Sequence, residues 1–196
     1  MLFNNKEEIN QALQGIATQD NGNLVINNAN KLRGDILDKL VLNAAINPSA
    51  EVKGLSRFII KAAALELGIV NSSIQGLYEA RGRGEIKGFT VPALNIRGLP
   101  YELCRAIFRT AIKTDAGAFI FELAKSEMNY TFQKPQELSA VILAAAIKEG
   151  YKGPVFIQGD HFQVNAKNYA QDKDKEIAGL KTLIENGIAG GFYNID

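Results

Sequence analysis

The second half of the chain alternates short apolar runs with longer helical patterns, and no other feature of the sequence constrains the fold as strongly. The apolar runs are Phe89–Ile96, Ala118–Leu123, Pro154–Gln158 and Gly191–Ile195. Each run is too short for a typical helix and is typical of a strand that is buried on both faces. Strands that alternate with helices indicate a parallel sheet built from βαβ units.

Proline and glycine mark the ends of the helical stretches between these runs. The first stretch opens with Pro100 and closes with Gly117, and the second opens with Pro135 and closes with Gly150. The third stretch ends at Gly187. Proline is tolerated in the first turn of a helix and glycine at its end, so these positions support three helices.

Two architectures fit this pattern, a doubly wound sheet and a (β/α)₈ TIM barrel. No Gly-x-Gly-x-x-Gly motif follows the first apolar run, where a dinucleotide-binding fold would have one. Polar residues gather where each run ends, as they do on the active-site face of a barrel. They are Asn95, Arg97, Lys125 to Glu127, Asp160, His161, Asn194 and Asp196. Because a complete barrel has eight strands, we expect residues 85–196 to form its N-terminal half, with four strands.

Residues 1–84 show helical periodicity, and we expect an all-helical region that carries no chemical motif. Apolar residues recur at helical spacing over residues 6–16 and 31–46. Ser49 is placed to cap a third helix, and a fourth short helix follows Ser73 and fades at Gly82. The chain is therefore predicted to have an α/β fold in which a helical region precedes a partial barrel.

Composition excludes several classes of partner. The formal net charge is +1, with 22 basic and 21 acidic residues, so we expect no nucleic-acid binding; Arg81 and Arg83 are explained by a solvated loop. No apolar run approaches about 18 residues, so we expect no membrane span. The chain has one cysteine, Cys104, within an apolar helical face. We expect Cys104 to be packed in the core, and a cytoplasmic location because no signal peptide pattern opens the sequence.

The residues Asp160 and His161 directly follow an apolar run and Gly159. An imidazole can bind a divalent cation while a neighbouring carboxylate moves a proton. The sequence alone leaves a second interpretation open, in which Asp160 caps a turn and His161 packs on it. His161 is the only histidine, so a metal site made of histidines alone is impossible within this chain.

Three segments resemble the class II, metal-dependent fructose-bisphosphate and tagatose-bisphosphate aldolases. "GFTVPALNIRG" is similar to the first barrel strand of this family, and "KGPVFIQGDHFQ" is similar to the third, which leads to an Asp-His pair. "GGFYNID" is similar to the fourth strand, which ends in Ile-Asp. The resemblance covers residues 85–196.

The resemblance implies a lyase of carbohydrate metabolism (glycolysis) that reversibly cleaves a ketose bisphosphate, of the fructose 1,6-bisphosphate type, into two triose phosphates. It implies that His161 binds Zn²⁺ or another divalent cation, that Asp160 is the catalytic acid and base, and that Asn95 contacts the phosphorylated sugar. The family's other metal ligands and its phosphate-binding loops belong to the second half of the barrel. We therefore expect this chain to be inactive by itself, and its free sheet edges predict a homo-oligomer.

The sequence also departs from the family. A serine is usual near the end of the second strand, whereas this chain reads "FELAKSEMN" there. Glu122 in this segment either faces the barrel interior or is a paired structural carboxylate, and Lys125 either meets a substrate phosphate or lies on the surface. The segment "QGDHFQVN" is also similar to the non-catalytic, chaperone-like subunit of tagatose-bisphosphate aldolase, which Asn165 fits better. Another barrel enzyme or binding module is the third possibility.

Overall fold

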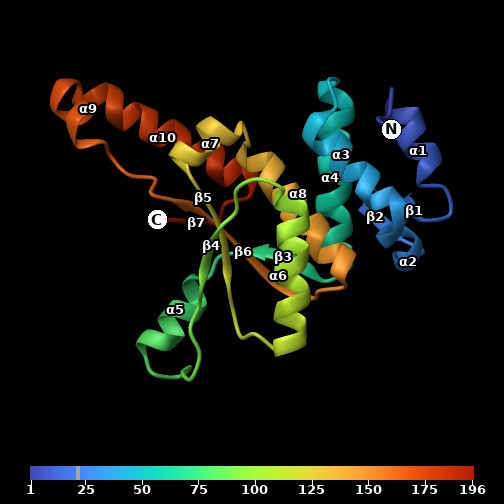
Figure 1. The fold of residues 1–196 in the computed structure, drawn as a ribbon, viewed down its shortest axis with the longest axis horizontal. Coiled ribbons are helices and arrows are strands. Elements are labelled where there is room, and N and C mark those ends of the chain that lie inside the picture. The colour runs from blue at the N-terminus through green and yellow to red at the C-terminus, as the bar shows by residue number, and fades with distance from the viewer. Residues whose placement is uncertain (21–22) are drawn as a thin grey trace. The chain divides into compact units, whose positions relative to one another are not determined.

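The computed structural model describes residues 1–20 and 23–196 as a mixed α/β structure, which confirms the predicted α/β class, while the partial barrel stays a prediction (Figure 1). The residues group into two compact units, each made of three segments that are separated in the sequence. Unit 1 comprises Met1–Val70, Leu99–Asp115 and Ala140–Val155, and unit 2 comprises Asn71–Gly98, Ala116–Ser139 and Phe156–Asp196. The predicted division of the chain after residue 84 stays a prediction.

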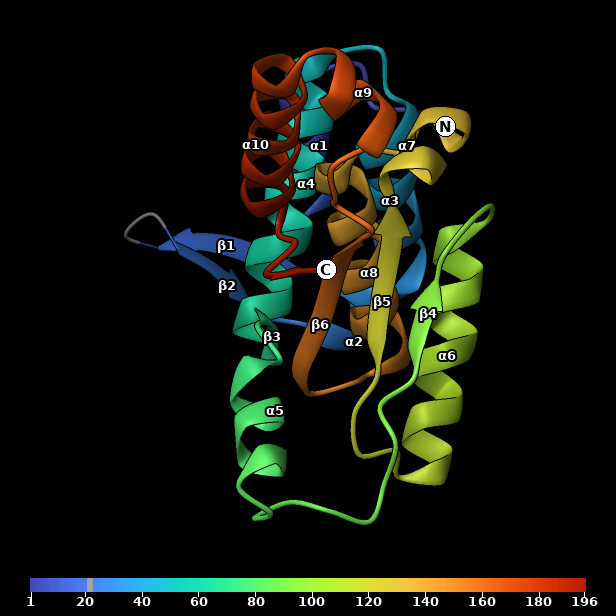
Figure 2. The ribbon, with the colours of Figure 1, turned by 90° about the vertical axis from the view of Figure 1, so that its left-hand side faces the viewer.

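The predicted apolar runs form a parallel sheet. Its strands β4 (Ala93–Asn95), β5 (Ile120–Ala124), β6 (Gly153–Asp160) and β7 (Asn194–Ile195) pair in chain order. Figure 2 shows β5 between β4 and β6. A further strand, β3 (Ile69–Ser72), is also hydrogen-bonded to β6. Because β5 takes one edge of β6, β3 and β7 share the other edge.

The last strand is shorter than predicted because the helix before it is longer. Helix α10 (Lys173–Gly190) continues past Gly187, and Gly191 ends it in the left-handed region with a φ of 105°. The side-chain amide of Asn71 then donates a hydrogen bond to the Gly191 carbonyl oxygen at 2.7 Å. Only Asn194 and Ile195 remain to pair with β6, where a strand over residues 191–195 was expected.

The two faces of the sheet differ in polarity. The strand register places Asn95, Glu122, Gln158 and Asn194 side by side in one row, so their side chains point to the same face. The other face carries apolar residues such as Phe121, which is fully buried. Residues of β4 and β6 on the polar face are partly exposed. The expectation that every strand is buried on both faces is therefore wrong for β4, β6 and β7 and right for β5.

Most of the predicted helices are present with the predicted starts. They are α1 (Lys6–Ala12), α4 (Ala50–Glu66), α5 (Gln75–Gly82), α6 (Pro100–Thr114) and α8 (Pro135–Glu149). Ser49 caps α4 as predicted, because its side chain accepts a hydrogen bond from the Val52 amide at 3.3 Å. Two short helices, α7 (Lys125–Thr131) and α9 (Ala166–Gln171), were not predicted.

The N-terminal region is not all-helical as expected. Strands β1 (Ala17–Asp20) and β2 (Asn23–Ile26) pair as an antiparallel hairpin, and β3 lies in this region too. The helix expected over residues 31–46 is interrupted as well. It consists of α2 (Ala29–Lys31), the π-helical segment η1 (Leu32–Ile36) and α3 (Leu37–Ile46), with Gly34 outside helical geometry at a ψ of −150°. The window contains enough apolar residues to suggest a continuous helix, but glycine permits this break.

Among the described residues, no helix combines the length and the apolar character that a membrane crossing requires.

The segment that leads to the predicted site is shaped by one aromatic ring. Phe162 is buried, and a Cβ atom on Gly159 would lie 2.6 Å from its ring. A Cβ atom on Gly187 would lie 3.1 Å from the same ring, and Phe192 packs near it with a centroid distance of 6.4 Å. Only glycine at residue 159 allows the ring to cover the end of β6.

We expect Gly159→Ala to destabilise the protein by about 1–3 kcal/mol, because the added methyl group overpacks an enclosed ring. Gly179→Ala is the matched control. Gly179 lies within α10 and a Cβ atom there has no neighbour within 4 Å, so alanine should stabilise the helix by up to about 1 kcal/mol. Urea unfolding measures both changes. Equal stability of Gly159→Ala and the wild type would show that the Phe162 ring is not confined.

Candidate functional site

The three residues predicted for the site lie together in unit 2, at the carboxyl ends of the parallel strands. Asn95 ends β4, Asp160 ends β6 and His161 follows it. The Asn95 side-chain amide donates a hydrogen bond to Oδ2 of Asp160 at 2.9 Å. Nε2 of His161 lies 3.6 Å from Oδ1 of Asp160. We name Asn95, Asp160, His161 and Asp196 the strand-end cluster; the roles predicted for its members stay predictions.

An unusual backbone conformation brings Asp160 and His161 to the same side. Adjacent side chains on a regular strand point to opposite faces. His161 has a φ of 52°, in the left-handed region that histidine enters more readily than most residues. The turn is held by Asp196, whose amide donates to the Gly159 carbonyl at 3.0 Å and whose carbonyl accepts from the Phe162 amide at 2.8 Å.

Asp160, His161 and Asp196 offer donor atoms that all lie within 4.8 Å of one another. Imidazole nitrogen and carboxylate oxygen are ligands that Zn²⁺ accepts, at about 2.0–2.2 Å, which places two donors of one ion roughly 3–4 Å apart. The 3.6 Å separation of Asp160 and His161 meets this requirement. The His161 side chain is 68% exposed, and Asp196 is exposed too. The donor set fits a divalent cation.

A buried carboxylate on β5 adds negative charge beside the cluster. Glu122 is only 7% exposed, and it accepts a hydrogen bond from the Gln158 amide at 3.1 Å. Burial, followed by the negative charges of Asp160 and Asp196, raises the pKa of the Glu122 carboxyl above its ordinary value. Glu122 therefore has the partner expected of a structural carboxylate and lies on the polar face of the sheet, whereas its place in a barrel interior stays a prediction.

Glu127, in the first turn of α7, was expected among the polar residues at the strand ends, but its contacts were not predicted. It is buried and accepts hydrogen bonds from the Asn95 side chain at 3.1 Å and from the Ala124 backbone amide at 2.9 Å. It also pairs with Arg97 at 2.8 Å. A glutamate three residues after a helix N-cap is the usual partner of the N-cap amide, so this spacing was a usable signal.

Other polar residues expected at the strand ends have different surroundings. The Asn194 side chain is hydrogen-bonded to backbone groups. It accepts a bond from the Ile74 amide at 2.8 Å and donates one to the Ile157 carbonyl at 3.1 Å. Asn165 caps α9 by accepting from two backbone amides. Cys104 is fully buried in α6 as expected, and burial raises the pKa of its thiol.

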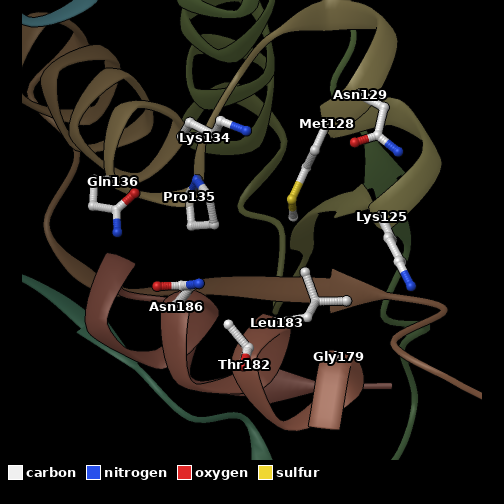
Figure 3. Close-up of a pocket in the computed structure, with 10 residues that line it drawn as sticks. All are labelled: Lys125, Met128, Asn129, Lys134, Pro135, Gln136, Gly179, Thr182, Leu183 and Asn186. Carbon is white, nitrogen blue, oxygen red and sulfur yellow. The ribbon is translucent and has the colours of Figure 1, made fainter. Parts of the chain in front are cut away.

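Two open pockets lie in unit 2. One, of about 570 Å³, is beside the strand-end cluster, and its polar lining includes Lys125, Ser126, Asn129, His161, Asn165 and Asn168. The other, of about 450 Å³, lies between α7, the start of α8 and α10. Figure 3 shows Met128 and Leu183 pointing into its centre and the two lysines, Lys125 and Lys134, at its sides. Lys125 is exposed and lines both pockets.

No protein family, curated protein or solved structure matches this chain.

The raised pKa of Glu122 predicts a pH-dependent effect of Glu122→Gln. The folded chain binds this proton more tightly than the unfolded chain, so the contribution of Glu122 to stability falls as the pH rises through its folded pKa. Glutamine stays neutral and can accept the bond from Gln158. We therefore expect Glu122→Gln to increase the free energy of unfolding at pH 7. The gain should disappear below about pH 4, where the carboxyl is protonated in both states.

Urea unfolding in EDTA at pH 7 and at low pH measures this difference. Glu185→Gln, at an exposed position on α10, is the control and should change stability little at either pH. A loss of stability for Glu122→Gln at pH 7 would contradict the electrostatic assignment.

Proposed function

We propose that residues 85–196 form the first half of a (β/α)₈ barrel of the class II aldolase type. A doubly wound sheet reverses its strand order at a switch point. β4, β5, β6 and β7 pair in chain order and are all parallel, as consecutive barrel strands are. The same sheet also contains β3, which pairs with β6 out of chain order and is not one of the four proposed barrel strands. The polar residues gather at the carboxyl ends of these strands, where barrel enzymes have their active sites.

The strand-end cluster is the observation that carries the proposed activity. His161 and Asp196 would hold a divalent cation, with Asp160 as a third donor while no substrate is bound, and Zn²⁺ is favoured by the imidazole and carboxylate donors. When bound, the cation would polarise the carbonyl oxygen of a ketose phosphate. The nearby carboxylates Glu122 and Asp160 make this region electrostatically favourable for a cation.

Asp160 is the proposed acid and base of the reaction. In the cleavage direction it takes the proton from the hydroxyl group on the carbon that becomes the aldehyde, and in synthesis it returns this proton. Its Oδ2 is held by Asn95, which leaves Oδ1 on the side of His161. The Asn95 amide donates to both Asp160 and Glu127, so a substrate hydroxyl group would meet the Asn95 carbonyl oxygen.

The non-catalytic subunit remains the alternative function. Asn165 favoured it in the sequence, but capping of α9 accounts for this residue. The two functions differ in what they require of the strand-end cluster, because a scaffold needs no cation. A cytoplasmic homo-oligomer that binds a phosphorylated sugar is part of the same proposal.

We expect the chain to bind one divalent cation weakly, since the cluster has one imidazole and its carboxylates are partly exposed. His161→Ala and Asp196→Asn should each lower the affinity at least about tenfold, and Glu185→Gln should leave it unchanged. Calorimetric titration with Zn²⁺, and with Mn²⁺ to reduce adventitious binding, measures the affinity. Absence of binding to the wild type, or equal affinity of His161→Ala, would favour the scaffold function.

In a barrel completed by four further strands, Asp160→Asn should lower the turnover of fructose 1,6-bisphosphate by about 10²–10⁴-fold. Cation binding should persist in this variant but weaken by up to about tenfold, because His161 and Asp196 are intact and only the Asp160 charge is lost. A coupled assay for triose phosphate gives the rate, and titration of the same preparation gives cation occupancy. Near-normal turnover of Asp160→Asn would refute the role of Asp160.

A further inference from the structure

We propose that Glu127 is a positioning residue, which orients Asp160 through the side chain of Asn95. The meaning of this orientation for catalysis rests on the proposed function, in which Asp160 moves the proton. The hydrogen-bonded chain itself runs from α7 through the end of β4 to the end of β6, and it is independent of any activity.

The side-chain amide of Asn95 is the centre of this chain. Its nitrogen lies 3.1 Å from Oε2 of Glu127 and 2.9 Å from Oδ2 of Asp160. An amide nitrogen carries two hydrogens, so each carboxylate receives one of them. Because both neighbours only accept hydrogen bonds when ionised, the amide nitrogen must face them and the carbonyl oxygen must point away. Glu127 thereby fixes which end of Asn95 meets Asp160.

The contacts of Glu127 exceed those needed to cap a helix. A cap requires only the bond from the Ala124 amide, at 2.9 Å. Glu127 makes two further contacts, with Asn95 and with Arg97, and both partners lie at the end of β4. A buried carboxylate is costly unless it is paired and hydrogen-bonded. The half-exposed guanidinium of Arg97 lies 2.8 Å from the Glu127 carboxylate and supplies the opposite charge that a buried carboxylate requires.

Glu127→Asp separates the effect of position from that of charge. Aspartate keeps the negative charge but is one methylene shorter, so it cannot reach Asn95 and Ala124 as glutamate does. We expect this variant to lower the affinity of the chain for Mn²⁺ about tenfold, the lower end of the range for residues that orient ligands. Glu185→Asp on the exposed side of α10 is the matched control and should leave the affinity unchanged.

A double-mutant cycle with Asn95→Ala shows whether Glu127 acts through Asn95. In the Asn95→Ala background, Glu127→Asp should change Mn²⁺ affinity less than about twofold, because the connecting amide is already gone. The same tenfold loss in both backgrounds would overturn the proposal and would indicate that Glu127 affects the site by a route other than Asn95. Far-UV circular dichroism of each variant excludes loss of α7 or of the fold as the cause.

The side-chain amide resonances of Asn95 give a readout that needs no cation. In ¹H–¹⁵N spectra recorded with EDTA, Glu127→Asp should shift both Asn95 side-chain protons while leaving the amides of unit 1 unchanged. Unshifted resonances would overturn the proposal even if affinity falls. If the wild type binds no Mn²⁺ but these resonances shift as expected, the proposed function fails while the positioning chain stands.

Discussion

Parallel pairing of β4, β5, β6 and β7 is the constraint on which the candidate site depends. Parallel strands end at the same edge of a sheet, so residues far apart in the sequence meet there without specific contacts of their own. The register aligns Asn95 with Glu122 and Gln158, and Asp160 lies two residues beyond Gln158 on the same face. The pairing of the strands therefore brings the Asn95 side-chain nitrogen to 2.9 Å from Oδ2 of Asp160.

The same placement concentrates negative charge. Glu122, Glu127 and Asp160 are largely buried, and Asp196 lies beside them. Arg97 pairs with Glu127. The side-chain amide of Asn95 donates a hydrogen bond to Asp160, and that of Gln158 donates one to Glu122. Burial raises the pKa of the Glu122 carboxyl most, and the remaining repulsion from Asp160 and Asp196 raises it further. A site with unbalanced negative charge and an adjacent imidazole is one in which a bound divalent cation relieves repulsion.

The sequence predicted the elements that depend on local patterns. Apolar runs bounded by proline and glycine located β5, β6, α6 and α8, because these signals act within a few residues. It did not predict β3, whose pairing with β6 depends on a partner more than 80 residues away. The hairpin of β1 and β2 was missed although the sequence between them reads Asn21-Gly22, the dipeptide most typical of two-residue hairpin loops.

In the candidate site, too, local patterns could be predicted and long-range contacts could not. Asp160 and His161 were identified by their place after an apolar run and Gly159. The two side chains reach the same side because His161 adopts a left-handed turn and the Phe162 ring covers the end of β6. Both features depend on tertiary packing, which cannot be predicted from one sequence. The position of Glu127 three residues after Ala124 could have indicated its bond to the helix cap. Its bond to Asn95 joins α7 to the end of β4, and the sequence gives no signal for such a contact.

Paramagnetic broadening by Mn²⁺ tests most directly whether the carboxyl ends of these strands form one cation site. In ¹H–¹⁵N spectra of the chain at low Mn²⁺ concentration, the amides that broaden first should be those of Gly159 to Phe162 and Asn194 to Asp196, followed by Asn95. Amides of the exposed acidic turn at the start of α10, Asp172 to Glu176, should keep their intensity. Broadening centred on that turn, or spread evenly over the exposed carboxylates, would contradict a cation site at the strand ends.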